Sequence, residues 1–201
     1  MTAPEPPRLA PRPPSPLREK LVDAGLALLR DGGLPALTLR RCAARAGVSH
    51  AAPAHHFDGL RGLLTAIAAR AFALFAARLA AAADHAGPDP RARLRAVCAA
   101  YLAFAAEEPA LFRLIFGDAD KDWADPDLRP PARAAYDALR DACAPFARSP
   151  DEAAALETAV RSLLHGHALL SAEGLLADAP GGRPEPSLDA LLALLRLPDP
   201  L

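Results

Sequence analysis

The sequence predicts an all-α fold, and two observations support this prediction. Apolar residues make up 52% of the 201 residues while aromatic residues make up only 5%, so Ala and Leu supply most of the apolar fraction. Both residues favour helices. Apolar positions also recur at the three- and four-residue spacing of amphipathic helices, and no stretch alternates as a half-buried strand would. The length suits one domain, or a small domain joined to a larger one.

The N-terminal part is basic and the remainder is acidic. Residues 1–61 hold nine Lys or Arg against five acids, a net charge of +4, whereas the rest holds 14 against 19, a net charge of −5. This asymmetry suits a protein that holds a polyanion at one end. Uneven solvation of an ordinary surface is the alternative.

The sequence predicts a cytoplasmic protein without a membrane span. Cys42, Cys98 and Cys143 lie far apart, so they predict reduced, structural thiols rather than a zinc site or disulfides. Prolines interrupt the first sixteen residues where a signal peptide needs an apolar run. No later stretch reaches about 18 residues without a charge or a proline.

The first helix is expected to begin after a proline-rich tail, residues 1–15, which should be disordered. Ser15 can cap this helix and Pro16 suits its first position. Leucines recur on one face until Gly32 and Gly33 end the helix.

Two short helices should follow and meet at a corner. Thr38 can cap the second helix, which Gly47 ends. Ser49 is expected to cap the third, with Pro53 at about its fourth position, where the missing N–H costs at most one early hydrogen bond.

A long alanine-rich helix is predicted from about residue 60 to 84, closed by the Gly-Pro-Asp-Pro stretch at 87–90. Further helices are predicted at about 91–107, 109–116, 131–147, 151–177 and 187–197.

The corner fits a helix-turn-helix. Such a unit needs a small residue in its first helix, a glycine in the turn and an apolar residue after it, and Ala43, Gly47 and Val48 meet these needs. The second helix can then enter the major groove of double-stranded DNA. The candidates for base contacts are Ser49, His50, Ala51, Ala52 and His55, and those for phosphate contacts are Thr38, Arg40, Arg41, His56 and Arg61. From spacing alone, an ordinary αα-corner stays open.

The stretch LTLRRCAARAGVSHAAPAHHF, between a helix and a long helix, resembles the tetracycline-repressor-like (TetR/AcrR) family of bacterial transcriptional regulators. The resemblance covers about 50 residues. The matching positions are Thr38, Ala43, Gly47, Val48, Ser49, His56, Phe57 and Leu63. It implies a three-helix DNA-binding head at 16–62 and a helical ligand-binding and dimerisation domain at 63–201.

Two positions depart from the family pattern. Ala54 stands where the family usually has a phosphate-binding tyrosine, and Leu60 stands where it usually has a phosphate-binding lysine. Losing both contacts should weaken non-specific affinity, unless His55 and Arg61 substitute. The alternative function is therefore a dimeric ligand-binding or protein-interaction module with weakened DNA binding.

The body resembles one subgroup's C-terminal domain, the type named for a Trp-His-Gly motif, over residues 101–117 and 163–170. Arg161 stands where that tryptophan is expected. The family implies a pocket for a small hydrophobic effector, and aromatic residues in consecutive helices could line one. The candidate ligand-binding residues are Phe72, Phe75, Tyr101, Phe116 and His165. A packed core is the alternative, favoured for Phe104 and Phe112.

The family also implies a homodimer formed through the last two long helices. Leucines between 163 and 176 and between 188 and 195 give two apolar helices, which could build a four-helix interface or merely cover the core of one chain. A twofold dimer suits a palindromic operator. The expected function is a regulator, most often a repressor, modulated by a small ligand.

Metal binding, cofactors and catalysis find no support in the sequence. The acidic stretch 118–127 begins like a calcium loop, but Trp123 replaces the required glycine and Arg129 replaces the bidentate glutamate. A solvated acidic loop is the expectation, with Trp123 folded onto the body. His165 and His167 would point apart on a helix, and no phosphate loop or nucleophile elbow appears.

Overall fold

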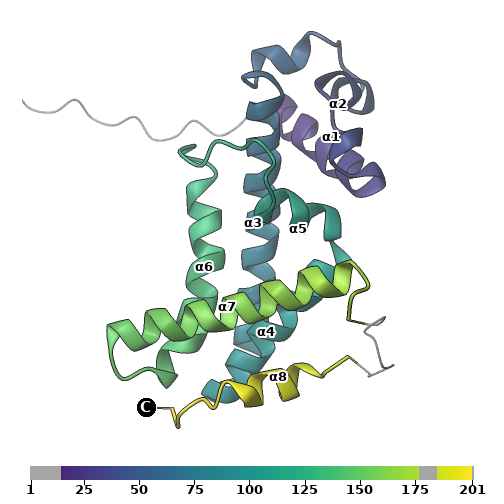
Figure 1. The fold of residues 1–201 in the computed structure, drawn as a ribbon. Coiled ribbons are helices and arrows are strands. Elements are labelled where there is room, and N and C mark those ends of the chain that lie inside the picture. The colour runs from purple at the N-terminus through teal and green to yellow at the C-terminus, as the bar shows by residue number, and fades with distance from the viewer. Residues whose placement is uncertain (1–14, 177–184, 201) are drawn as a thin grey trace, which may run out of the picture.

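The computed structural model describes residues 15–176 and 185–200, and within these ranges the chain is all-α, as the sequence predicts. The predicted disorder of the proline-rich tail concerns residues outside these ranges, apart from Ser15. The chain forms a small head at one end of a long helix and a larger helical body along the rest of it (Figure 1).

The head contains α1 (Pro16–Gly32), a short 3-10 turn η1 (Leu34–Ala36), α2 (Leu39–Arg45) and a second 3-10 turn η2 (Ala52–His55). Two of the predicted caps are confirmed: Ser15 Oγ accepts a hydrogen bond from the Arg18 N–H, and Thr38 Oγ1 accepts one from the Arg41 N–H at 3.2 Å. Because each cap acts on the helix that starts beside it, local sequence is enough to place these helix starts.

The third segment of the head differs from the expected α-helix. Ser49 does not cap it; the residue before η2 is Ala51. In an α-helix starting at Ser49, the first backbone bond would run from the nitrogen of residue 53 to the Ser49 carbonyl, but Pro53 has no N–H. The Ala52 N–H donates to that carbonyl instead, at 3.0 Å, which is the tighter 3-10 pattern.

Helix α3 (Gly59–His85) joins the head to the body and runs without interruption across the predicted division at residues 62 and 63. By length and mean hydropathy it could span a membrane, but 61% of its most apolar stretch is buried inside the protein. Helices from both the head and the body pack on it, so it is a core helix.

The body consists of α4 (Pro90–Glu107), α5 (Pro109–Phe116), α6 (Arg129–Cys143) with the 3-10 turn η3 (Ala144–Phe146), α7 (Pro150–Ala172) and α8 (Leu188–Leu194). Helix α6 runs beside α3, and α7 crosses over α4 and α6 (Figure 1). Apolar side chains of α3, α4, α5, α6 and α7 form one core with those of the head.

Three body helices end earlier than the sequence predicted, and α8 is the shortest of them, ending at Leu194. Helix α6 stops at Cys143 because Pro145 cannot donate an α-helical hydrogen bond, and η3 follows. Helix α7 stops at Ala172, where Gly174 takes a φ of 73° and the Leu175 N–H donates to the Leu170 carbonyl at 2.9 Å. This hydrogen-bond pattern is the Schellman motif that commonly ends helices.

Candidate DNA-binding surface and effector cavity

The corner between α2 and η2 lies where the sequence predicts the turn of a helix-turn-helix, and the 3-10 turn η2 stands in place of its second helix. Gly47 takes a φ of 67°, a left-handed conformation that favours glycine, and nothing would meet a side chain there. The Val48 N–H donates to the Ala43 carbonyl at 3.0 Å, and Ala43 is fully buried. The left-handed backbone conformation therefore explains why glycine is favoured at position 47, and a lack of space for a side chain does not.

The predicted base-contacting residues lie on the turn and on η2. Ser49, His50, Ala51 and His55 are exposed, whereas Ala52 is half-buried. They therefore stand where the N-terminal part of a recognition helix would lie, the part that contacts base edges in the major groove.

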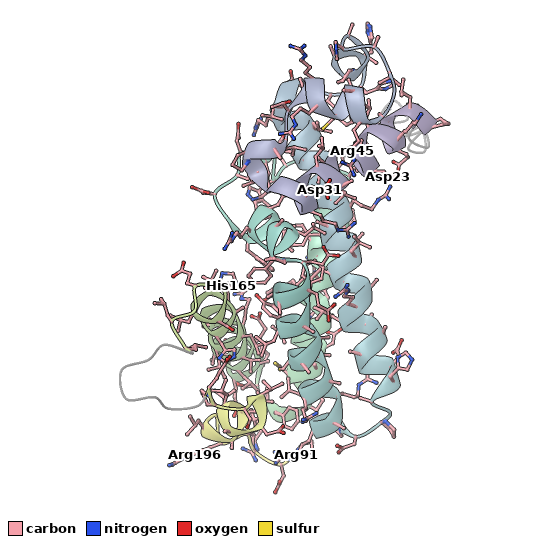
Figure 2. All side chains as sticks on the ribbon, turned by 90° about the vertical axis from the view of Figure 1, so that its right-hand side faces the viewer. Asp23, Asp31, Arg45, Arg91, His165 and Arg196 are labelled. Atoms are coloured by element: carbon pink, nitrogen blue, oxygen red, sulfur yellow. The ribbon has the colours of Figure 1, made fainter. Side chains whose placement is uncertain are left out.

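The predicted phosphate-contacting residues divide into two groups. Thr38, Arg40 and Arg41 are exposed at the start of α2, and neither arginine forms an ion pair with any residue that the structure describes. The neighbouring Arg45 forms an ion pair with Asp31 of α1 at 2.8 Å, and both residues are labelled in the head in Figure 2. Arg40 and Arg41 are thus the arginines of α2 available to an external anion.

His56 and Arg61 are engaged within the protein. Nδ1 of His56 lies 3.4 Å from Ser15 Oγ. Arg61, exposed near the start of α3, donates from Nε to Asp120 at 3.0 Å and lies 3.6 Å from Asp122. Both aspartates belong to the loop of residues 117–128, which we call the acidic loop. A phosphate would therefore compete with this loop for Arg61.

The body contains a cavity of about 180 Å³ between α3, α4, α5, α6 and α7. Four of the five candidate ligand-binding residues line it: Phe72, Phe75, Tyr101 and Phe116. Phe104 and Phe112 are buried in the core, the position favoured for them. Trp123 of the acidic loop also lines the cavity, and its ring lies 6.0 Å from that of Phe72.

His165 lies behind the cavity rather than in its wall. Its Nδ1 is 3.1 Å from the Tyr101 hydroxyl, and its ring packs against those of Phe112 and Phe116. Burial, and to a lesser degree the charge of Arg161, lower the pKa of His165. Figure 2 places His165 in the body, between the head and the far end marked by Arg91 and Arg196.

Sequence reasoning missed three polar residues of the cavity wall: Tyr136, Glu157 and Arg161. A signal for one of them was available. Glu157 falls at helical spacing with Val160, Leu164 and Ala168, which form the buried face of α7. A carboxylate on an apolar stripe is a group that needs a partner.

Other reactive groups form no site in the described part of the chain. It contains no group of three or more His, Cys, Asp or Glu side chains that could hold a metal ion. Cys42, Cys98 and Cys143 are free and buried, and burial raises their pKa values to about 11, 12 and 12. The thiols therefore stay protonated.

Comparison with known proteins places the chain in a family. Residues 21–67 match the family described as bacterial regulatory proteins, tetR family, and residues 94–195 match the tetracyclin repressor-like C-terminal domain. The chain is 41% identical over 87 residues to the HTH-type transcriptional regulator BetI of Burkholderia mallei, and 37% identical over 83 residues to that of Burkholderia ambifaria. Each of these matches covers 41% of this chain and 43% of the relative.

Solved structures agree with the fold over nearly the whole chain. A protein of unknown function from Rhodococcus sp. RHA1 has a TM-score of 0.72 and 29% identity, covering 94% of this chain and 95% of that one. A possible TetR family transcriptional regulator from Streptomyces coelicolor A3(2) has a TM-score of 0.57 and 27% identity, covering 89% and 79%. This chain belongs to the TetR family of bacterial transcriptional regulators, and is not an enzyme. The Trp-His-Gly subgroup assignment stays a prediction.

Proposed function

We propose that this chain is a cytoplasmic transcriptional repressor that binds a palindromic operator as a homodimer and releases it when a small hydrophobic effector occupies the body. The observation that carries the proposal is that one continuous helix, α3, connects the head, with its exposed corner between α2 and η2, to the aromatic cavity of the body. In this arrangement α3 links the DNA-binding residues and the cavity.

Arg40 and Arg41 support the DNA-binding part. Both are exposed near the start of α2, the helix that precedes the turn carrying Ser49 and His50. Arginines placed in this way can fix the position of the protein on the phosphates while residues of the turn contact base edges.

Surface leucines at the end of α7 support the homodimer. Leu169 and Leu170 are exposed there, and small residues such as Ala159 and Ser162 lie exposed earlier on the same helix. Small residues let a partner helix approach closely, and burial of the leucines would stabilise association. Two heads related by a twofold axis would meet half-sites about 34 Å apart, or a multiple of this distance.

The effector would act through its preference for one conformation of the body. A ligand shifts an equilibrium only by the difference between its affinities for the two states. The acidic loop connects the two sites, since Trp123 lines the cavity while Asp120 and Asp122 bind Arg61 near the head. We therefore expect effector to bind the free protein more tightly than the DNA-bound protein.

DNA binding is the first test. The purified full-length protein would be titrated with fragments of its own upstream DNA at several salt concentrations, beside an Arg41→Ala variant. We expect saturable binding that resists competitor DNA, and a loss of about one unit of salt slope in the variant because one phosphate contact is gone.

The matched control is Arg148→Ala, which removes an exposed arginine of the body between η3 and α7. It should bind as the wild-type protein does. Weak binding that competitor DNA abolishes, or equal losses in both variants, would contradict the proposal.

A second candidate function is a ligand-binding module with a weakened head. Leu60 is 40% exposed where the family has a phosphate-binding lysine, and Ala54 is exposed where it has a tyrosine. The double substitution Ala54→Tyr with Leu60→Lys distinguishes the two functions. A large gain in non-specific DNA binding would favour the weakened head, and no change would show that other residues already hold the phosphates.

A further inference from the structure

A buried carboxylate lies in the wall of the aromatic cavity. Glu157 projects from α7 and is only 1% exposed, although the rest of the buried face of α7 is apolar. Removing a charged carboxylate from water costs several kcal/mol unless partners compensate for the loss. The groups around the Glu157 carboxylate therefore indicate which kind of ligand the cavity binds.

The carboxylate is only partly satisfied. The Tyr136 hydroxyl donates to Oε2 at 3.2 Å. The other oxygen, Oε1, is buried and accepts no hydrogen bond from any residue that the structure describes. Nε of Arg161 lies 3.5 Å from Oε1, close enough for charge attraction but without hydrogen-bond geometry. One carboxylate oxygen in the cavity wall is thus left without a hydrogen-bond partner, and its negative charge can pair with a positively charged ligand group.

Aromatic rings surround the same space. Phe72, Phe75, Tyr101, Phe116, Trp123 and Tyr136 all line the cavity. The faces of such rings attract cations, and an aromatic enclosure is a common way of binding ammonium groups. Both features of the wall therefore favour positive charge.

The two other polar groups of the wall do not make an anion site. The Tyr101 hydroxyl is already bonded to His165. Arg161 is 44% exposed, and its guanidinium lies 5.3 Å from the ring centre of Tyr136 while it is attracted to Glu157. The deeply buried charge is thus the carboxylate, and Arg161 is a solvent-accessible cation that a ligand could replace.

We propose that the cavity binds an organic cation, whose ammonium group lies among the aromatic rings and pairs with Glu157. This inference rests on the proposed function in one respect, that the cavity is the effector site. The cavity is smaller than the roughly 300 Å³ of common ligand pockets, so a compact ligand fits it. A larger one would have to displace Trp123, whose side chain is 55% exposed.

The test uses two probes of the same shape and different charge. Benzyltrimethylammonium carries the cation, and neopentylbenzene has a carbon in place of the nitrogen. Trp123 is the only tryptophan in the chain, so its fluorescence reports binding of each probe to the full-length protein directly. We expect the cation to bind about tenfold or more tightly than the neutral probe, because ring faces and a buried carboxylate both attract it.

Two variants assign that preference to named groups. Glu157→Gln keeps the shape of the side chain and should remove most of the preference. Arg161→Met removes the competing cation from a half-exposed position and should strengthen binding of benzyltrimethylammonium. The control Glu107→Gln alters an exposed glutamate that pairs with Arg78, and should leave the preference unchanged. Circular dichroism would verify that each variant is folded.

Three results would overturn the proposal. The first is equal binding of both probes, and the second is a preference that survives in folded Glu157→Gln. The third is tighter binding of an additional, anionic probe, phenylacetate, than of the cation, which would make Arg161 the recognising group. The measurement contains no DNA, so its failure can be distinguished from a failure of the operator-binding test. A protein that binds the cation but no operator would leave this inference standing and contradict the regulator.

Discussion

The hydroxyl of Tyr101 and Nδ1 of His165 lie 3.1 Å apart, between the cavity and the core. Tyr101 comes from α4, His165 from α7, and the rings of Phe112 and Phe116 on α5 enclose the pair. Arg161, one turn earlier on α7, adds a positive charge that disfavours protonation of His165. Burial and this charge keep the imidazole neutral near pH 7.

We expect His165 to make the folded state sensitive to mild acid. Its pKa in the folded protein lies below the ordinary value of 6.5, so the unfolded chain takes up the proton first as the pH falls. Stability from the neutral imidazole is therefore present above about pH 6.5 and is lost below it. Thermal unfolding at about pH 7.5 and about pH 5.5 should show a larger fall in Tm for the wild-type protein than for a His165→Asn variant.

The control for this measurement is His50→Asn, at an exposed position in the head. It should keep the wild-type fall in Tm. Parallel behaviour of the wild-type protein and His165→Asn would show that this imidazole does not titrate differently in the two states.

At the scale of elements, the acidic loop makes more contacts with the rest of the protein than the expected solvated loop would. Lys121 is buried, and its Nζ donates to the Leu114 and Gly117 carbonyls at 2.8 and 2.9 Å. The Asp122 N–H donates to Thr65 Oγ1 on α3 at 2.9 Å. Asp127 approaches Arg18 of α1 at 3.4 Å. These bonds fasten the loop to both the body and the head.

The position of the loop predicts that its carboxylates restrain DNA binding. The double substitution Asp120→Asn with Asp122→Asn should release Arg61 and strengthen non-specific DNA binding. One added phosphate contact corresponds to an increase of about one unit in the salt slope. Affinities measured across a salt series would show it.

The same double substitution made with Arg61→Ala should give no gain in slope, because the released contact is missing. Asp84→Asn with Glu173→Gln, which removes two exposed acids of the body, controls for the change in net charge. An equal gain in this control would show that overall charge, not Arg61, is responsible.

At the scale of the whole molecule, α7 carries surface leucines that the single chain leaves exposed. Leu169 is 42% exposed, Leu170 lies beside it, and Leu175 follows just after the helix. An apolar surface of this kind on a folded chain marks a place of association. In a homodimer these side chains would be buried and would hold the two heads at a fixed spacing.

We expect Leu169→Glu to yield a monomer, because it places a charge in the proposed interface. Sedimentation velocity should show the change in mass. Operator affinity should fall by orders of magnitude, since one head no longer holds the other near its half-site. Leu74→Glu, at a leucine of α3 that is 39% exposed, should remain dimeric. A monomeric wild-type protein would contradict the interface.

The sequence by itself determined the helical class, most helix boundaries and the corner of the head. These features depend on interactions between residues close in the chain: Thr38 caps the helix that follows it, and Gly47 takes its left-handed φ within the turn. The same local chemistry explains the 3-10 turn, because Pro53 has no N–H to donate to the Ser49 carbonyl.

Only the tertiary structure decided which distant groups meet. Arg61 pairs with Asp120, 59 residues further along the chain, and Tyr136 bonds with Glu157 across two helices. Helical periodicity could show that Glu157 lies on a buried face, but not which side chain would partner it. The packing of α6 and α7 around α3 and α4 sets those distances, because contacts between elements depend on how whole helices fit together.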